Sequence, residues 1–348
     1  MSALLIGMFV VTGFCTSFYK HQRANLGGRH YAEGQRLEST GDIEAAVEEY
    51  RRALIFAPDD TDYRISFASA LIGAGRFEEA ASHIDQLLGE DPTNGALNRM
   101  RAHLAERQNH TAAAIDYYQR AVYEYWPPNK LAERARARWE LINLLERTGR
   151  REEAVGELMT LYANTTIGPS GKLDIGFALL RNNAGSEAAQ IFRDAARTQP
   201  KDPRAHEGLG EAYLASGEFV SARHEFERAI KLEPKDKEAA NSLALTNAII
   251  DMDPDLPGVT NAERRRRSTN LLRRVVYFLR QCSGGMDVDD RLQTADNLVK
   301  GEKVKSADIS FDTLDLAKEL WKDRASLCPD SPPSDPEVSR VMDRMSRE

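Results

Sequence analysis

The sequence predicts an all-α fold: a solenoid of stacked helical hairpins that begins with a hydrophobic helix and ends in a helical cap. Prolines recur at a spacing of 34 residues, between Pro58 and Pro92 and again between Pro200 and Pro234. Small residues and large apolar residues recur at the same offsets before these prolines. Apolar side chains beyond the last repeat recur with the period of a helix. A repeat of this length holds two helices, which cannot bury their faces alone and therefore stack on the next repeat.

The chain begins with residues 2–19, which carry no charge and are followed by Lys20, Arg23 and Arg29. As a helix this segment would be about 27 Å long, enough to cross the hydrocarbon core of a bilayer. No basic residue precedes it, which is atypical of a cleaved signal peptide. We therefore expect residues 1–20 to contain a membrane anchor; a cleaved signal and a buried terminal helix are the alternatives.

Six full repeat units can be placed on the sequence. The interval between Pro92 and Pro200 equals three periods plus six residues. The extra residues fall in the stretch EYWPPNKLA, where Pro127 and Pro128 interrupt the pattern. The units then begin near residues 27, 61, 95, 135, 169 and 203.

Each unit repeats one skeleton, which in the sixth unit consists of Gly210, Gly217, Ala222, Phe226 and Pro234. The small residue of the first helix and the alanine of the second mark the closest approach of the two helices, while the large residues fill the space between units. The glycine after the first helix permits a left-handed turn. The proline ends the second helix because it cannot continue one. The glycines at the turn position are Gly41, Gly75, Gly149 and Gly217.

This pattern resembles the tetratricopeptide repeat family over roughly Gly27 to Ile250. The period, the small-residue positions and the terminal proline agree with the family, whereas its tryptophan position is filled here by His30, Arg64 or His206. The resemblance implies a right-handed superhelix of about seven units over residues 21–253. It also implies binding of peptides or protein surfaces, and it implies no reaction.

In this family the first helices line a concave face. The family's concave positions predict a partner-binding groove formed by Tyr31, Ile65, Ile72, Trp139, Asn143, Leu173, Phe177 and Leu180. Glu207 and Glu211 occupy the same positions in the sixth unit. An exposed apolar strip of this kind marks a protein-binding site; the alternative is that these side chains pack between helices. The lysines and asparagines with which some family members clamp a C-terminal carboxylate are absent from their positions here.

Residues 237–254 have the pattern of a seventh first helix, and we expect the arginine-rich stretch 262–282 to be its partner helix. Apolar side chains between Leu271 and Leu279 fall on one arc of that stretch. The opposite arc carries Arg266, Arg267, Arg273, Arg274 and Arg280. We expect this basic helix face to be solvated; docking of an acidic partner and contact with anionic lipid headgroups are the alternatives. No helix-turn-helix pattern accompanies it, so no nucleic-acid partner is expected.

The sequence predicts that residues 254–330 form a helical cap, followed by a linker and a short terminal helix within residues 331–348. Cys282 and Cys328 each end a predicted helix of this cap. A disulfide between them would close a loop of 46 residues; two reduced thiols are the equal alternative. The basic residues after the anchor favour a cytoplasmic domain, whereas a disulfide favours an oxidising compartment. We expect the extracytoplasmic (periplasmic) side, with the cytoplasmic side left open.

No motif in the sequence indicates catalysis. The net charge is −7, and the three cysteines form no CxxC pattern. We therefore expect no catalytic residue, no metal and no cofactor. The sequence favours a membrane-anchored adaptor, which holds a protein partner at a bacterial-type cell envelope as an assembly factor or accessory subunit. The alternative is a structural protein whose repeats stack on other copies of the chain, forming a homo-oligomer or a filament.

Overall fold

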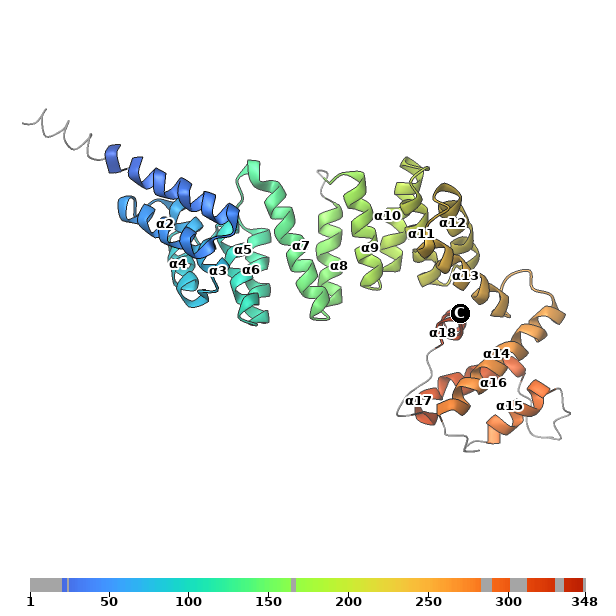
Figure 1. Ribbon diagram of the computed structural model, residues 1–348. Helices are drawn as coiled ribbons and strands as arrows, with labels where there is room; N and C mark the ends of the chain where they lie inside the picture. Colours follow the sequence, from blue (N-terminus) through green and yellow to red (C-terminus); the bar gives the residue numbers. More distant parts are fainter. Residues whose placement is uncertain are drawn as a thin grey trace, which may run out of the picture. The chain divides into compact units, whose positions relative to one another are not determined.

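The computed structural model describes residues 21–23, 25–163, 167–282, 290–300, 312–328 and 335–346. In these residues the regular structure is helical, apart from one isolated bridge between Asn94 and Tyr125 (Figure 1). The chain divides into two compact units, here called unit 1 (Met1–Leu161) and unit 2 (Tyr162–Glu348). The predicted anchor lies outside the described residues. Within the described ranges, no helix has the length and hydrophobicity needed to cross a bilayer.

Unit 1 consists of helices that pair in sequence order. After a helical segment over residues 25–40, its elements are α2 (Ile43–Phe56), α3 (Thr61–Gly73), α4 (Phe77–Glu90), α5 (Gly95–Arg107), α6 (Thr111–Tyr123), the short 3₁₀ helix η1 (Pro128–Lys130), α7 (Leu131–Arg147) and α8 (Arg151–Tyr162). Each helix packs against its neighbour along the chain, from α2 through α7.

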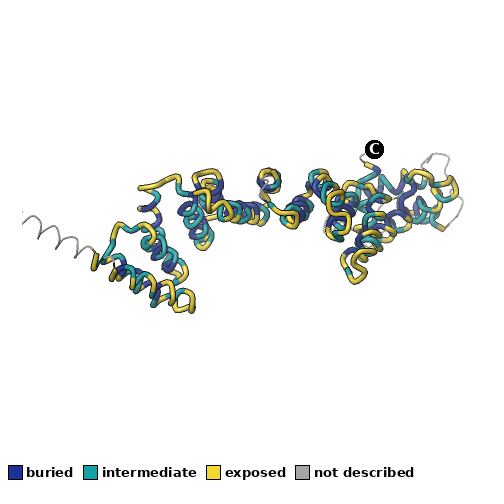
Figure 2. The backbone as a smooth tube through the Cα atoms, turned by 90° about the horizontal axis from the view of Figure 1, so that it is seen from above, coloured by how far each residue is buried: buried dark blue, intermediate teal, exposed yellow. Residues whose placement is uncertain are grey.

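Unit 2 continues the same arrangement and adds the cap. Its elements are α9 (Pro169–Arg181), α10 (Gly185–Thr198), α11 (Pro203–Ser216), α12 (Phe219–Leu232), α13 (Lys237–Met252), α14 (Asn261–Cys282), α15 (Asp290–Lys300), α16 (Thr313–Lys322), α17 (Arg324–Leu327) and α18 (Pro336–Met345). Buried positions recur along one side of most helices and exposed positions along the other (Figure 2).

The turn between the two helices of a repeat is left-handed, as the sequence predicts. Gly41, Gly75, Gly149 and Gly217 have φ angles between 75° and 86°. In the third and fifth repeats, where no glycine stands at this position, Asn109 and Asn183 adopt φ angles of 60° and 61°. Asparagine tolerates the left-handed region better than other residues with a Cβ atom. The turn therefore keeps its left-handed conformation in all six repeats.

In the first, fifth and sixth repeats, the glycine of the first helix lies against an aromatic ring of the second helix. A Cβ atom on Gly176 would lie 2.6 Å from the ring of Phe192, and one on Gly210 would lie 2.7 Å from the ring of Phe226. Phe192 is also covered from the next first helix, by Gly208 of α11. Phe192 and Phe226 are fully buried. The glycines therefore set the distance between helices by admitting whole rings, which confirms their predicted role.

The six-residue insertion is held in place by one buried indole ring. Trp126 lies against Gly95, and its Nε1 donates a hydrogen bond to the carbonyl oxygen of Ala121 at 2.5 Å. The backbone of Tyr125 pairs with both Thr93 and Gly95 at 3.1 Å. The insertion is therefore an ordered loop that packs against the start of α5 and is hydrogen-bonded to it.

The partner of α13 differs from the predicted one. We expected the arginine-rich helix to complete a hairpin with α13. Instead α14 packs mainly against α15 and α16, and the terminal helix α18 packs along α13. Arg344 of α18 donates bidentate hydrogen bonds of 2.6 and 2.7 Å to Asp253, which is fully buried. The apolar stripe of α18 joins the core cluster of the cap through Val338, Val341, Met342 and Met345.

Candidate protein-binding surfaces of the repeats

The first helices α9, α11 and α13 form one side of the repeats in unit 2, here called its first-helix face. Phe177 of α9 is half-buried and lies edge-to-face on Phe192, with ring centroids 4.9 Å apart. The guanidinium group of Arg204 lies 5.4 Å from the centre of the Phe177 ring and forms an ion pair with Asp174 at 2.7 Å. Leu180 is also half-buried. Two of the predicted groove residues therefore keep part of their apolar surface open to solvent.

Carboxylates surround the same face on α11 and α13. Burial, together with the negative charges of Asp236, Glu238 and Glu211, raises the pKa of Glu207 to about 7, although the nearby Arg204 lowers it. Glu211 accepts a hydrogen bond of 2.5 Å from the hydroxyl group of Ser242. This part of unit 2 therefore concentrates negative charge that its own cations do not offset. A cationic group arriving here would lower the pKa of Glu207 and favour its ionised form.

In unit 1 the predicted groove residues Tyr31, Ile65 and Ile72 are half-buried, as Phe177 and Leu180 are. The hydroxyl group of Tyr31 lies 3.1 Å from that of Ser66, and the Tyr31 ring stacks on Tyr63 at 4.5 Å. Tyr31 and Ile72 both pack against the hydrophobic cluster of that unit. Tyr31 and Ile72 therefore contribute to the packing between helices, and the role of these side chains in partner binding stays a prediction.

The two remaining groove residues of unit 1 lie on α7. Trp139 is half-buried and Asn143 is exposed. Trp139 and Asn143 belong to unit 1, whereas Leu173, Phe177 and Leu180 belong to unit 2. A continuous strip through all five residues therefore remains a prediction.

The charged side chains of the first helices in unit 1 are paired with one another. Arg99 of α5 donates bidentate hydrogen bonds of 2.7 and 2.6 Å to Glu140 of α7, and His103 lies 3.2 Å from the same carboxylate. Burial alone would raise the pKa of Glu140, but Arg99 and His103 outweigh it and hold the pKa at about 2. Arg147 and Glu106 form a second pair at 2.6 Å. These ion pairs join α5 and α7, the first helices of two successive repeats within unit 1.

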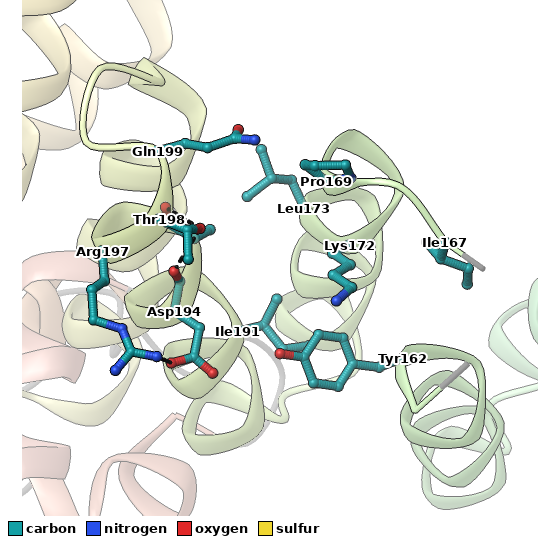
Figure 3. A pocket seen from close by; sticks show the side chains of 11 residues that line it. Tyr162, Ile167, Pro169, Lys172, Leu173, Ile191, Asp194, Arg197, Thr198 and Gln199 are labelled. Carbon is teal, nitrogen blue, oxygen red and sulfur yellow. Dashed lines mark hydrogen bonds and ion pairs between the residues drawn. The ribbon is translucent and has the colours of Figure 1, made fainter. Parts of the chain in front are cut away.

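Leu173 lies apart from the open surface. It is 2% exposed and lines a pocket of about 470 Å³ together with Tyr162, Pro169 and Ile191 (Figure 3). The ammonium group of Lys172 lies 5.5 Å from the centre of the Tyr162 ring at this pocket. Leu173 therefore does not extend the exposed strip that the spacing predicts.

The arginine side chains of α14 are largely engaged by the unit itself. Arg267 is mostly buried and donates hydrogen bonds to the carbonyl oxygens of Ile250 and Asp253 at 2.5 and 3.0 Å. The other arginines of the predicted basic face have acceptors nearby, in pairs that join Arg266 to Glu263, Arg273 to Asn270, Arg274 to Asp335 and Glu337, and Arg280 to Asp296. The predicted basic helix face is thus partly neutralised, and its role in lipid or partner binding stays a prediction.

Cys328 is buried and disulfide-bonded. The side chain of Cys282 lies outside the described side chains, so the predicted pairing of these two cysteines stays a prediction. In the described part of the chain, no cluster of three or more histidine, cysteine, aspartate or glutamate side chains could hold a metal ion.

Two surfaces were not predicted from the sequence. Tyr123, Tyr125 and Leu131 flank the insertion and are 48–65% exposed. A second pocket, between α10 and α12, is described below. Neither surface lies at a position that repeat periodicity singles out, although the departure from the 34-residue spacing was a signal for the first.

The fold is that of a helical repeat protein, a class whose side chains form extended binding surfaces. Family models described as tetratricopeptide repeat match residues 31–95, 65–130, 99–171 and 179–245. These segments together cover more than half of the chain, which therefore belongs to the tetratricopeptide repeat family. Proteins of this family mediate protein–protein interactions.

Several curated proteins are similar to the chain. A TPR repeat-containing protein of Pseudomonas aeruginosa is 30% identical over 184 residues, covering 51% of this chain and 69% of that protein. U-box domain-containing protein 70 of rice is 21% identical over 266 residues, or 73% of this chain. Hsp70-Hsp90 organizing protein 2 of Arabidopsis thaliana is 22% identical over 194 residues, or 56% of this chain. The chain spans about a third of the length of each of the two plant proteins.

Solved structures also resemble the chain. YrrB, described as a TPR protein with an unusual peptide-binding site, has a TM-score of 0.43 and 17% identity, covering 56% of this chain and 98% of that one. The C-terminal part of a TPR repeat-containing protein from Cytophaga hutchinsonii has a TM-score of 0.46 and 13% identity, covering 89% of this chain and 98% of that one.

Proposed function

We propose that the protein is a non-enzymatic scaffold that holds a protein partner on the first-helix face of unit 2, at the cell envelope, with residues 2–19 as its membrane anchor. The partner presents a segment that carries basic side chains next to an apolar one. The apolar side chain lies on Phe177 and Leu180, and the basic side chains face Glu207 and Glu211. The anchor raises the local concentration of the scaffold near a membrane-bound partner.

The charge distribution around Glu207 is the observation that supports this proposal most. A carboxyl group with a pKa of about 7 is held in an unfavourable field by its neighbours. A cationic partner would relieve that repulsion, whereas an anionic partner would increase it. Electrostatic complementarity of this kind speeds association and excludes partners of the wrong charge. The half-buried Phe177 on the same face supplies apolar surface for affinity.

The location at the envelope rests on two features. Residues 2–19 carry no charge over a length sufficient for a bilayer. The disulfide bond of Cys328 favours an oxidising compartment. We place the repeats on the extracytoplasmic side for these reasons.

The proposal is tested by extracting the tagged full-length protein from its native membrane in mild detergent and identifying the protein that copurifies in stoichiometric amount. Phe177→Ala removes the half-buried ring and is expected to lower retention of that partner at least tenfold. Val220→Ala serves as the matched control, because Val220 is 41% exposed and lies on α12, outside the first-helix face. Circular dichroism checks that both variants keep their helices.

Two outcomes would contradict the proposal. Retention unchanged by Phe177→Ala would remove the first-helix face of unit 2 from partner binding. Retention that is equally strong at pH 6 and pH 8 would count against Glu207, since binding of a cation should strengthen as this carboxyl group ionises through its pKa of about 7.

A further inference from the structure

A second pocket lies on the opposite helices of unit 2, here called the second-helix pocket. It measures about 760 Å³ and lies between α10 and α12, with α11 as its floor. Leu209, Tyr213 and Leu232 contribute apolar surface to it. Leu232 is 39% exposed. The α11 residues that line this pocket, at positions 206, 209 and 213, differ from those on the first-helix face, at positions 207 and 211.

The rim of the second-helix pocket is strongly basic. Its cations are Arg193, Arg197, Arg228 and Lys231, and Glu225 is the one carboxylate among its lining residues. Glu225 is already engaged, because His206 lies 2.7 Å from it and Arg228 donates a hydrogen bond of 3.0 Å to it. Arg197 has only a long contact of 3.3 Å with Asp194.

Two of these cations have no such contact. Within the described ranges, neither Arg193 nor Lys231 forms an ion pair or a side-chain hydrogen bond, and both are exposed. The pocket therefore combines an apolar floor with cationic groups that are free to receive an acidic partner. This positive charge stands out in a chain whose net charge is −7.

The matching surface is present on the same unit. The first-helix face carries the carboxylates of Glu207, Glu211 and Glu238, which are near enough for the charges of Glu211 and Glu238 to act on Glu207, and it also carries the half-buried ring of Phe177. Its charge is opposite to that of the second-helix pocket, and each surface combines charged groups with apolar ones. A lipid headgroup or a nucleic-acid backbone would satisfy the cations but would leave the apolar floor without a partner.

We infer that the second-helix pocket of one molecule receives the first-helix face of a second copy. This inference rests on the proposed function, because it names a second copy of the chain as the cationic partner of that face. The two surfaces differ, so the contact is head-to-tail. A head-to-tail contact that does not close into a ring leaves one free surface of each kind at the ends and adds further copies.

The test uses the full-length chain in mild detergent at about 0.05 M salt, where exposed charges are weakly screened. Sedimentation velocity is followed as the protein concentration rises to about 100 µM, a range that covers weak but specific contacts. The pocket variant is Arg193→Glu with Lys231→Glu. The face variant is Glu207→Gln with Glu211→Gln. The wild type should form a series of oligomers, and each variant alone should raise the dissociation constant at least tenfold.

The decisive sample is the equimolar mixture of the two variants. The pocket variant keeps its acidic face and the face variant keeps its basic pocket, so one contact of the two remains possible. The mixture is expected to form dimers and nothing larger. A wild type that stays monomeric over the whole range, variants that associate like the wild type, or a mixture that stays monomeric would each overturn the inference. A monomeric wild type that still loses a different copurifying protein on Phe177→Ala would leave the proposed function standing.

Discussion

The carboxyl group of Glu207 should make the stability of unit 2 depend on pH. Burial, followed by the charges of Asp236, Glu238 and Glu211, raises its pKa from 4.5 to about 7 in the folded protein. The folded state therefore binds more protons than the unfolded state between these two values. Its stability should be greatest below about pH 4.5 with respect to this group, and should fall as the pH rises through 7.

The size of the effect follows from the two pKa values. A difference between 4.5 and about 7 corresponds at most to about 3.4 kcal/mol of unfolding free energy. Glu207 is only partly buried, and solvent screening of such a group reduces the expected effect to about 1 kcal/mol. Replacing Glu207 with glutamine removes the charge and keeps the shape of the side chain.

The assay is urea unfolding of the full-length wild type and of Glu207→Gln at pH 5 and at pH 8, followed by circular dichroism. The variant should be more stable than the wild type by about 1 kcal/mol at pH 8, and the difference should shrink at pH 5. Glu233→Gln, at the exposed end of α12, is the matched control and should show the same difference at both pH values. A Glu207→Gln difference that is equal at pH 5 and pH 8 would refute the reasoning.

Three further predictions concern packing and turns. Gly208→Ala should cost about 2 kcal/mol of unfolding free energy because the new Cβ atom would overlap the Phe192 ring. In a chain that already carries Phe192→Leu, the same change should cost much less. Costs of the two changes that simply add in urea unfolding would argue against the contact. Asn109→Ala should cost about 1 kcal/mol through its φ of 60°, whereas Asn109→Gly should cost nothing, and equal stabilities would contradict this. Arg344→Met should cost about 3–5 kcal/mol by leaving the buried carboxylate of Asp253 unpaired, and a cost below about 1 kcal/mol would show that water replaces the arginine.

Much of the fold could be predicted because the repeat turns local chemistry into a periodic signal. A glycine that must adopt positive φ, as at Gly217, is visible in the sequence, and so is a glycine that must admit a ring, as at Gly210. The end of unit 2 was predicted less well. A short terminal helix was predicted, but the sequence pattern did not indicate which helix it packs against. The ion pair between Arg344 and Asp253 settles that choice, and it joins residues with no periodic relation.

The candidate site could be predicted only in part, for a related reason. Family positions identified Phe177 and Leu180, which remain partly open, but they also identified Leu173, which is buried between helices. The field around Glu207 arises partly from Asp236, whose backbone-capping role at the start of α13 is a local feature. The effect of Asp236 on the carboxyl group of Glu207 in α11 depends on the distance between neighbouring repeats, which the spacing of residues alone does not give.

The contact between α13 and α18 also has a consequence for how the chain folds. Inside the repeats, packed helices are neighbours in sequence, so their contacts close short loops and can form quickly. Arg344 meets Asp253 across 91 positions, and Arg340 reaches the carbonyl oxygen of Leu214 across 126. Closing such long loops costs more chain entropy and comes later. During refolding, α13 therefore keeps the apolar side that α18 covers exposed until α18 docks. The protein is most prone to aggregate during this interval.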